Sequence, residues 1–432
     1  MTTKTRTATK TRTGEGVRAQ ILDVVTAAKA ASRQLAKASA DQKNAALRAM
    51  AASLRSERAQ ILTANAADVS AARRAKLAPP LIERLTLTPK RVDEMIASVE
   101  SVAQLPDPVG EVLKMWRRPN GLLIGKMRVP LGVVGIIYES RPNVTSDCAA
   151  LCLKSGNAVV LRGGREAFSS NWAIAQLLQD AAACAGLPRA AISVIPTAER
   201  VGVDIMLEMD QAINVIIPRG GEALIRAVVE KSSIPVIKHA KGVCHVYVDD
   251  AADLAMAERI VLNAKCQRPA TCNAMETLLV HQDVAAKFLP RVAAQLRKAG
   301  VELCGCERTR RLVTGVKAAT EADWSTEYLA LILSIRVVDS LEAAMDHIAR
   351  YGSSHSDAIV TADHARAMRF LNEVDSACVY VNASTRFTDG YQFGLGAEIG
   401  ISTDKLHARG PMGLEELTTY KYIVFGDGQL RT

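Results

Sequence analysis

The sequence predicts an α/β protein with two parallel-sheet domains and a small antiparallel β element. Two observations support this fold class. From about residue 129 to residue 381, short apolar runs rich in β-branched residues alternate with helix-like stretches, as in βαβ units. Two further strand-like runs flank an Asn-Gly turn, which is typical of a β-hairpin. With 432 residues, of which 49% are hydrophobic and 23% charged, the chain suits about two or three folded domains and is not a disordered protein.

Much of the positive charge lies at the N-terminus. Of the formal net charge of +9, residues 1–20 contribute +4, since they hold five basic residues and one acidic residue. This Thr-rich stretch lacks apolar periodicity, so we expect residues 1–15 to form a disordered basic tail. A transit peptide is the alternative, because the stretch is rich in arginine and poor in acids, but it has no amphipathic stripe.

Helices are expected over residues 17–100, where apolar residues such as Ile21, Val24 and Ala28 recur at helical spacing. Residues 112–118 and 122–128 then form the predicted hairpin. An isolated hairpin is only marginally stable, so we expect it to pack on another domain or subunit, with residues 418–425 as a partner strand.

The parallel strands follow in order. In the first sheet we expect them at residues 133–138, 158–161, 192–195, 215–217, 236–238 and 245–248. A helix at residues 253–264 separates these strands from a second series, which we expect at residues 275–280, 334–338, 358–361 and 379–381. The alternation predicts a second α/β domain.

Two similar turns follow strands of the first predicted sheet. Residues 159–167 and 215–223 each combine an apolar strand, an Arg-Gly-Gly turn and a helix. Glycine lets a phosphate approach the backbone, and the N-terminus of the following helix favours its negative charge. The pair predicts a dinucleotide site, and ordinary tight βα turns are the alternative, because the standard G-x-G-x-x-G and P-loop fingerprints are absent. The residues concerned are Arg162, Gly163, Gly164, Arg165, Arg219, Gly220 and Gly221.

Cys272 is the candidate nucleophile among nine cysteines. It lies in a polar, proline-interrupted loop that also carries Lys265 and Arg268, and nearby cations lower the pKa of a thiol. Cys266 has no expected role, and the other cysteines suit packing in a reducing compartment. The Cys-Gly-Cys run at residues 304–306 has no second Cys or His pair nearby, so no metal site is expected.

Composition and patterning exclude other classes of protein. No apolar run reaches the roughly 18 residues that span a bilayer, so we expect no membrane segment. The absence of a secretory signal pattern predicts a cytoplasmic location. Nucleic-acid binding predicts basic clusters interleaved with aromatic residues, but the arginines here lie among alanines. We therefore expect no nucleic-acid partner.

Three long motifs carry a family resemblance. They are residues 129–147 with the core Y-E-S-R-P-N-V, residues 263–276 around Cys272, and residues 394–419. Together they resemble the gamma-glutamyl phosphate reductases, also called glutamate-5-semialdehyde dehydrogenases, of the aldehyde dehydrogenase superfamily. The likeness covers about residues 17–428. It implies NADPH-dependent reduction of L-glutamyl 5-phosphate to L-glutamate 5-semialdehyde and phosphate, in proline biosynthesis.

The resemblance also implies a domain plan of two Rossmann-like parallel-sheet domains and a small β oligomerisation element. Residues 16–110 and 133–252 would form the NADPH-binding domain, and residues 253–410 the catalytic domain. The oligomerisation element would comprise residues 111–132 and 411–432. A homodimer is the expectation, and glutamate 5-kinase, which makes the labile acyl phosphate, is a candidate partner.

Several residue roles follow from the resemblance alone. Cys272 matches the nucleophile, Asn143 the asparagine whose amide helps to hold an oxyanion, and Glu327 the glutamate that holds the nicotinamide ribose. Arg162 and Arg165 would suit the 2′-phosphate of NADPH. The turn Arg219-Gly220-Gly221 corresponds to the pyrophosphate side.

Residues 238–242 stand where hydrolytic relatives carry Glu-Leu-Gly-Gly, and they include no carboxylate that could activate water. A thioester on Cys272 would therefore survive for reduction or for attack by phosphate. Lys238, His239 and Arg268 are expected near the substrate phosphate. A hydrolytic or CoA-acylating aldehyde dehydrogenase, which would share the fold and Cys272, is the alternative.

Overall fold

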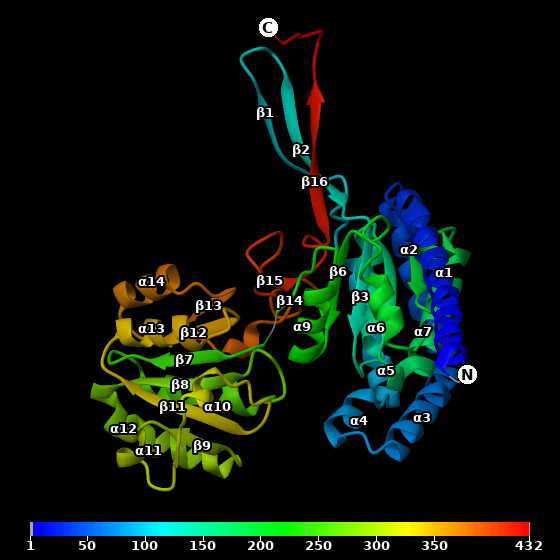
Figure 1. The fold of residues 1–432 in the computed structure, drawn as a ribbon. Helices are drawn as coiled ribbons and strands as arrows, with labels where there is room; N and C mark the ends of the chain where they lie inside the picture. Colours follow the sequence, from blue (N-terminus) through cyan, green and yellow to red (C-terminus); the bar gives the residue numbers. More distant parts are fainter. Residues whose placement is uncertain (1–2, 240, 432) are drawn as a thin grey trace. The chain divides into compact units, whose positions relative to one another are not determined.

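The computed structural model describes residues 3–239 and 241–431, and the chain divides into two compact units. Unit 1 comprises Met1–Ile237, Gly394–Gly400 and Met412–Thr432. Unit 2 comprises Lys238–Phe393 and Ile401–Pro411. Figure 1 follows the chain through both units. The described part of the chain contains no helix long and apolar enough to cross a membrane.

The first helix, α1 (Thr3–Leu35), includes much of the expected tail. The prediction of disorder is therefore wrong for residues 3–15, while residues 1–2 lie outside the described residues. An established helix extends without a new nucleation step, so even threonines of modest helix propensity can continue it.

Four helices follow, as expected for residues 17–100: α2 (Ala40–Ser56), α3 (Arg58–Arg74), α4 (Pro79–Leu85) and α5 (Pro89–Gln104). The side chains of Ser39 and Thr88 accept hydrogen bonds from backbone N–H groups in the first turns of α2 and α5. Such caps satisfy donors that have no partner within the helix. Proline begins α4 and α5, where its missing N–H has no cost.

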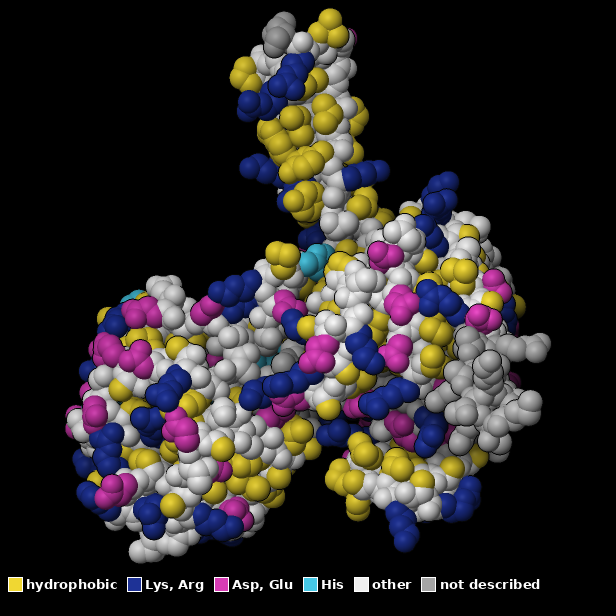
Figure 2. All heavy atoms as spheres, in the orientation of Figure 1, with side chains coloured by type: hydrophobic (Ala, Val, Ile, Leu, Met, Phe, Trp, Pro, Cys, Tyr) yellow, Lys and Arg dark blue, Asp and Glu magenta, His cyan; other side chains and the backbone are white. Residues whose placement is uncertain are grey.

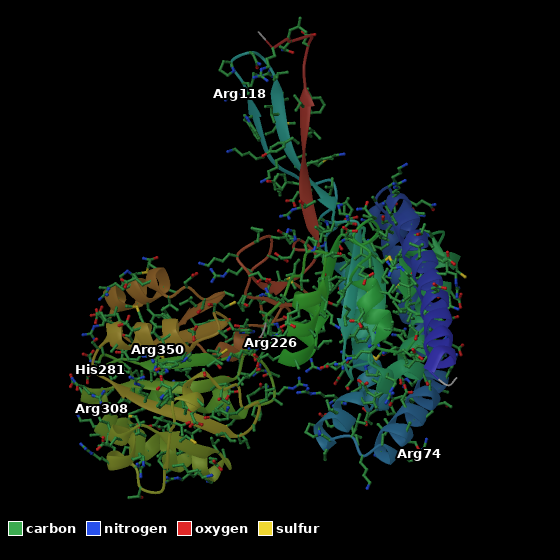
Figure 3. All side chains as sticks on the ribbon, viewed as in Figure 1. Arg74, Arg118, Arg226, His281, Arg308 and Arg350 are labelled. Carbon is green, nitrogen blue, oxygen red and sulfur yellow. The ribbon has the colours of Figure 1, made fainter. Side chains whose placement is uncertain are left out.

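The predicted hairpin is confirmed. Strands β1 (Val112–Arg117) and β2 (Leu123–Pro130) pair antiparallel, and β16 (Thr418–Phe425) pairs antiparallel with β2. We call this three-stranded sheet of order β1-β2-β16 the arm. Arg118 lies at its far end (Figure 3).

The other sheet of unit 1 has four parallel strands in the order β5-β4-β3-β6. Its strands are β3 (Val133–Tyr138), β4 (Ala158–Gly163), β5 (Ile192–Val194) and β6 (Val215–Arg219). Its helices are α6 (Asn143–Lys154), η1 (Arg165–Ala167), α7 (Phe168–Cys184), η2 (Arg189–Ala191), α8 (Val201–Met206) and α9 (Glu222–Lys231). The strand expected at residues 236–238 is wrong, because only Val236 forms a bridge, to Ile216, after Pro235, which has no N–H to donate.

Unit 2 contains a seven-stranded parallel sheet of order β10-β9-β11-β8-β7-β12-β13. Its strands are β7 (Cys244–Val248), β8 (Met275–His281), β9 (Glu302–Gly305), β10 (Lys317–Ala318), β11 (Ile332–Val338), β12 (Ser356–Val360) and β13 (Cys378–Val381). Its helices are α10 (Leu254–Cys266), α11 (Gln282–Lys298), α12 (Glu307–Leu312), η3 (Ala322–Ser325), α13 (Leu341–Tyr351), α14 (His364–Glu373) and η4 (Thr385–Phe387). Strands β9 and β10 were not expected.

Strand β7 corrects the expected domain boundary. The resemblance implies a first domain that includes residues 133–252, but β7 lies between β8 and β12 and is buried along its whole length. A fully buried central strand belongs to the sheet that covers both its edges. The chain therefore passes into unit 2 at residues 237–238. Where it passes between the units again, β14 (Gly400–Ser402) and β15 (Gly410–Met412) form a two-stranded sheet.

Candidate active site

Cys272 lies in the loop that joins α10 to β8, and its side chain is half-buried. The next residue anchors the loop, since the Asn273 amide donates to the Thr388 carbonyl at 2.8 Å and its own carbonyl accepts from Thr385 Oγ1 at 2.7 Å. The carbonyl of Cys272 accepts from the Cys244 thiol at 3.2 Å. The nucleophile predicted from sequence is thus held through its own carbonyl and through the following residue, Asn273.

Gly242 packs directly on the same carbonyl. A Cβ at this position would lie 1.8 Å from the Cys272 carbonyl oxygen, which no side chain can tolerate. The chain carries a glycine here because another backbone segment approaches at van der Waals distance.

Two histidines converge on the thiol. The Cys272 Sγ atom and one ring nitrogen each of His239 and His355 lie within 4.8 Å of one another. His239 Nδ1 donates to the Ile401 carbonyl at 3.0 Å, which fixes the ring. Burial lowers the pKa of His355 to about 3, with a smaller contribution from His239, so the His355 ring is neutral. His239 was expected near the substrate phosphate, whereas the role of His355 was open from sequence.

The cations beside Cys272 differ from those expected. Lys265 is completely buried and its Nζ lies 2.5 Å from Glu276 Oε2, so that carboxylate compensates its charge. Arg268 is exposed on the loop. Arg386, in η4, is half-buried and interacts electrostatically with Cys272. Burial lowers the pKa of Arg386, and Arg268 adds to the effect while Cys272 opposes it. Sequence reasoning missed Arg386, because no local pattern connects η4 with the Cys272 loop.

The segment that begins at Lys238 is fixed by internal contacts. Lys238 Nζ pairs with Asp404 at 2.8 Å, and Lys241 Nζ donates to the Ser325 carbonyl at 2.9 Å. The Gly242 N–H donates to Glu327 Oε1 at 3.0 Å. A carboxylate therefore does reach this segment, but Glu327 supplies it from the turn before β11.

The first Arg-Gly-Gly turn lies at the carboxyl end of β4 in unit 1. Arg162 Nη2 donates to the carbonyls of Ala198 and Glu199 at 3.1 and 3.0 Å, and its Nε is buried with no partner among the described residues. Burial lowers the pKa of Arg162, Glu166 opposes that shift, and Arg200 adds to it. Arg200 is a nearby cation that the sequence did not single out. Arg165 is exposed.

Neighbouring side chains leave no room for a Cβ at either glycine of this turn. A Cβ on Gly163 would lie 2.0 Å from Asn171 Nδ2, and one on Gly164 would lie 2.2 Å from Glu166 Oε1. The Glu166 carboxylate is oriented by Ser140, whose N–H and hydroxyl both donate to its Oε1.

At the second turn, which leads into the N-terminus of α9, a backbone N–H is already bonded to a carboxylate of the protein itself. The Gly221 N–H donates to Glu139 Oε2 at 2.9 Å. Arg219 is half-buried, and its charge opposes the burial-driven rise in the pKa of Asp147. The donor expected for a pyrophosphate thus binds the Glu139 carboxylate in this structure.

Asn143 begins α6, and its side-chain amide donates to Asp147 Oδ2 at 3.0 Å. Of the expected site residues, Asn143 and both Arg-Gly-Gly turns belong to unit 1. The other expected residues, Cys272, Glu327, Lys238, His239 and Arg268, belong to unit 2. Within unit 2 the structure brings His239 to Cys272 and links Glu327 to the Cys272 carbonyl through Gly242.

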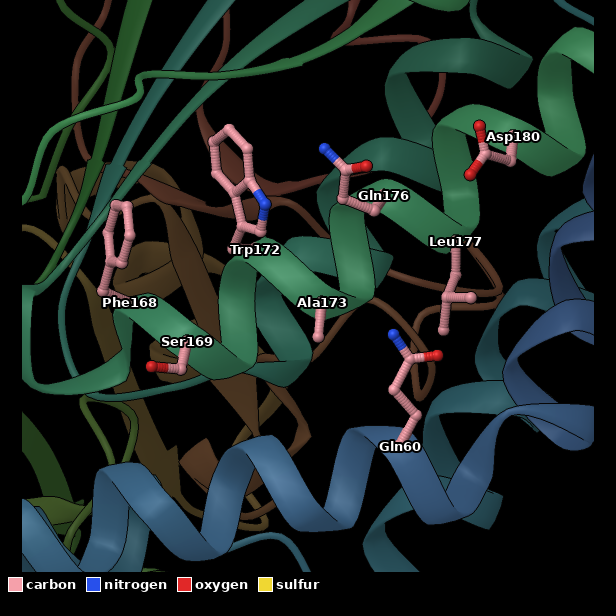
Figure 4. A pocket seen from close by; sticks show the side chains of 8 residues that line it. All are labelled: Gln60, Phe168, Ser169, Trp172, Ala173, Gln176, Leu177 and Asp180. Carbon is pink, nitrogen blue, oxygen red and sulfur yellow. The ribbon is translucent and has the colours of Figure 1, made fainter.

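A separate cavity of about 580 Å³ opens between α3 and α7 in unit 1 (Figure 4). The rings of Phe168 and Trp172 stack at its wall with centroids 6.0 Å apart, and Gln60 faces it from α3. None of the residues expected for catalysis or cofactor binding lines this cavity.

Comparisons with known proteins agree with the sequence motifs. Residues 4–304 match the model of the aldehyde dehydrogenase family. A gamma-glutamyl phosphate reductase of Moorella thermoacetica is 59% identical over 404 residues, which is 94% of this chain and 97% of that protein. The same enzyme of Carboxydothermus hydrogenoformans is 57% identical over 412 residues, covering 95% and 99%. The crystal structure of gamma-glutamyl phosphate reductase from Thermotoga maritima superimposes with a TM-score of 0.94 at 47% identity, covering 96% of this chain and 100% of that one.

Proposed function

Because the chain belongs to the gamma-glutamyl phosphate reductases of the aldehyde dehydrogenase family, we propose that it reduces L-glutamyl 5-phosphate to L-glutamate 5-semialdehyde and phosphate with NADPH. The observation that carries the proposal beyond family membership is the surroundings of Cys272. Its thiol lies beside two histidines and an arginine, in a segment whose peptide is fixed from both sides. The reaction would serve proline biosynthesis in the cytoplasm.

The Cys272 thiolate is the proposed nucleophile. It attacks the acyl carbon of the substrate, a C–S bond forms, and the C–O bond to phosphate breaks, so that phosphate leaves with the electron pair. His239 Nδ1 donates to the Ile401 carbonyl, and in the neutral ring this leaves Nε2 as the acceptor for the thiol proton. The positive charge of Arg386 favours the thiolate over the thiol.

Arg268 and Arg386 are the proposed ligands of the departing phosphate. They are close enough that Arg268 contributes to the lowered pKa of Arg386, and an anion between two arginines would relieve that repulsion. Lys238 and His239 stay candidates for the same region, although Lys238 is already paired with Asp404.

Unit 1 is the proposed NADPH-binding unit and unit 2 the catalytic unit. The orphaned buried Nε of Arg162, with Arg165 and Arg200 nearby in sequence or in space, fits the 2′-phosphate of NADPH. Bound NADPH would supply the hydride for reduction. The resemblance supports Glu327 for the nicotinamide ribose and Asn143 for the oxyanion, and Gly163, Gly164, Gly220 and Gly221 for the approach of phosphates.

The arm is the proposed oligomerisation element. Hydrophobic side chains are exposed on its strands, among them Met115, Tyr422 and Val424, and Figure 2 shows them gathered there. Such a patch on a two-sided, three-stranded sheet is typical of a surface that a second subunit covers. We propose a homodimer, and association with glutamate 5-kinase is a further proposal that rests on the lability of the acyl phosphate.

Replacement of two cysteines tests the nucleophile. Cys272→Ala should lower the rate of phosphate-dependent oxidation of glutamate semialdehyde on the order of 10⁴-fold or more, because alanine has no thiol with which to form the thioester. Cys266→Ser, six residues earlier in the sequence, is the matched control and should retain activity. Full activity of Cys272→Ala would refute the assignment.

A further inference from the structure

We infer that Lys265 and Glu276 are positioning residues that tie the nucleophile loop to the turn carrying Glu327. The inference rests on the proposed function, since it takes Cys272 as the nucleophile and Glu327 as a cofactor ligand. Neither Lys265 nor Glu276 touches the reacting atoms, and their effect would pass through backbone contacts.

The ion pair closes the nucleophile loop at its base. Lys265 lies in the last turn of α10 and Glu276 is the second residue of β8, so the two flank the loop that contains Cys272. Their Nζ and Oε2 atoms are 2.5 Å apart, and neither side chain has any solvent exposure. A buried ion pair of this kind fixes the separation of its two backbone segments, because moving them apart would leave two buried charges without their main compensation.

The same carboxylate also holds the neighbouring turn. Glu276 Oε1 accepts from the Leu329 N–H at 3.1 Å. Leu329 adopts a φ of 52°, a left-handed conformation that a leucine takes only when surrounding contacts enforce it. Lys265 Nζ lies over the ring of Tyr328, 6.0 Å from its centroid, so both members of the pair interact with the turn.

From this turn the contacts return to Cys272. Glu327 Oε1 accepts from the Gly242 N–H at 3.0 Å, and Gly242 packs on the Cys272 carbonyl with no room for a side chain. A closed circuit thus runs from the base of the nucleophile loop, through Glu276 and the turn, to Glu327, Gly242 and the nucleophile itself. All of its members belong to unit 2.

Charge balance explains why the lysine is needed. Burial raises the pKa of Glu276, Lys265 opposes that rise, and the nearby Glu327 adds to it. Burial also lowers the pKa of Lys265, which Glu276 opposes. Lys265 therefore opposes both the burial of Glu276 and its repulsion by Glu327, and so favours the ionised carboxylate that accepts from Leu329.

Two double variants separate positioning from simple stability. Lys265→Met with Glu276→Gln removes both charges and keeps an amide oxygen that can accept from Leu329. Lys265→Met with Glu276→Met also removes both charges but leaves no acceptor. We expect the dissociation constant for NADPH to rise about tenfold in the second relative to the first, and the rate of alkylation of Cys272 by iodoacetamide, followed by peptide mass spectrometry, to change only in the second.

Glu276→Asp is the second test, because it keeps the charge and should fold, yet its shorter side chain withdraws from Leu329. It should raise the NADPH dissociation constant in the same way. Asp249→Asn is the matched control: Asp249 is a buried carboxylate that follows β7 at the opposite end of the sheet and bonds to Tyr247, Thr361 and Arg366. It should lower the melting temperature and leave NADPH affinity unchanged.

The inference would be overturned if the NADPH dissociation constant and the rate of Cys272 alkylation were the same in the two double variants and in Glu276→Asp. The ion pair would then be a purely stabilising element. That outcome is distinct from failure of the proposed function, in which the wild-type protein itself would show no phosphate-dependent reduction of NADP⁺.

Discussion

At Gly242, a single added methyl group would clash with the backbone of the Cys272 loop. A Cβ there would lie 1.8 Å from the Cys272 carbonyl, so Gly242→Ala must displace the backbone behind the nucleophile. A shift of about 1 Å in a reacting group costs on the order of 10²-fold in rate, and we expect kcat to fall by about that factor. The measurement is kcat together with the melting temperature.

Gly16→Ala is the control, because a Cβ there would meet nothing within 4 Å. It should leave kcat unchanged. Wild-type kcat in Gly242→Ala would show that the contact with the Cys272 carbonyl does not position the nucleophile.

His347 gives unit 2 a predictable sensitivity to acid. Burial lowers its pKa to about 2, with His245, Arg336 and Arg350 adding to the effect, and Arg336 Nη1 lies 2.9 Å from its Nδ1. In the unfolded chain, a histidine has a pKa of about 6.5 and binds a proton at mildly acidic pH, whereas His347 in the folded state stays neutral. The contribution of neutral His347 to the free energy of unfolding is therefore complete above about pH 6.5 and falls as the pH drops.

At pH 5 the loss amounts to about 2 kcal/mol relative to neutral pH. His347→Gln should therefore lose less stability than the wild type between pH 7.5 and pH 5, measured by urea unfolding. Glu276 shifts in the opposite direction, but it is present in both proteins and drops out of the comparison. Parallel pH profiles for the two proteins would contradict the neutral, buried state of His347.

At the same scale, the sequence predicted a candidate nucleophile but not all of its neighbours. A polar loop with a cysteine between a helix and a strand was sufficient to select Cys272. Lys265, which we expected beside the thiol, is buried and forms an ion pair with Glu276. Arg386 and His355 reach the site through tertiary packing, and nothing in their local sequence distinguishes them from ordinary surface or core residues.

Among the elements, the arm makes the clearest prediction. Tyr422 and Val424 alternate on one face of β16, each is more than half exposed, and Tyr422 meets Trp116 of β1 edge to face. If a second subunit covers this face, Val424→Asp should convert a dimer into a monomer, because the interface would bury an unpaired charge. Light scattering after size-exclusion chromatography measures the change.

Arg74→Glu, an exposed substitution on α3, is the matched control and should leave the mass unchanged. A dimeric Val424→Asp protein, or a monomeric wild type, would exclude the arm as the interface.

Elements with a strong hydrophobic pattern could be predicted from sequence. The fully buried strands β3, β7 and β8 were found nearly to their ends, since continuous apolar runs mark strands covered on both faces. Strands β9 and β10 were not predicted, because they are short and β10 is exposed, so neither has a continuous apolar run. The hairpin was found from turn chemistry, which acts locally.

For the whole molecule, the fold class followed from the alternation of strands and helices, but the division of the chain did not. Helices α1–α5 precede the first parallel strand, and the segments 394–400 and 412–432 return to unit 1, separated by residues 401–411 of unit 2. The sheet that a strand joins depends on the strands that pair with its two edges. For β7 these are β8 and β12, and both come later in the chain. Sequence order alone therefore placed the boundary too late.

Phosphate dependence of the reverse reaction decides the function proposed for the molecule. Supplied with L-glutamate 5-semialdehyde and NADP⁺, the protein should form NADPH only when inorganic phosphate is present. Residues 238–242 contain no carboxylate that could activate water against the thioester, and the Glu327 carboxylate that reaches this segment already accepts from the Gly242 N–H. NADPH formation at the same rate without phosphate, or only with coenzyme A, would contradict the account and identify a hydrolytic or CoA-acylating aldehyde dehydrogenase instead.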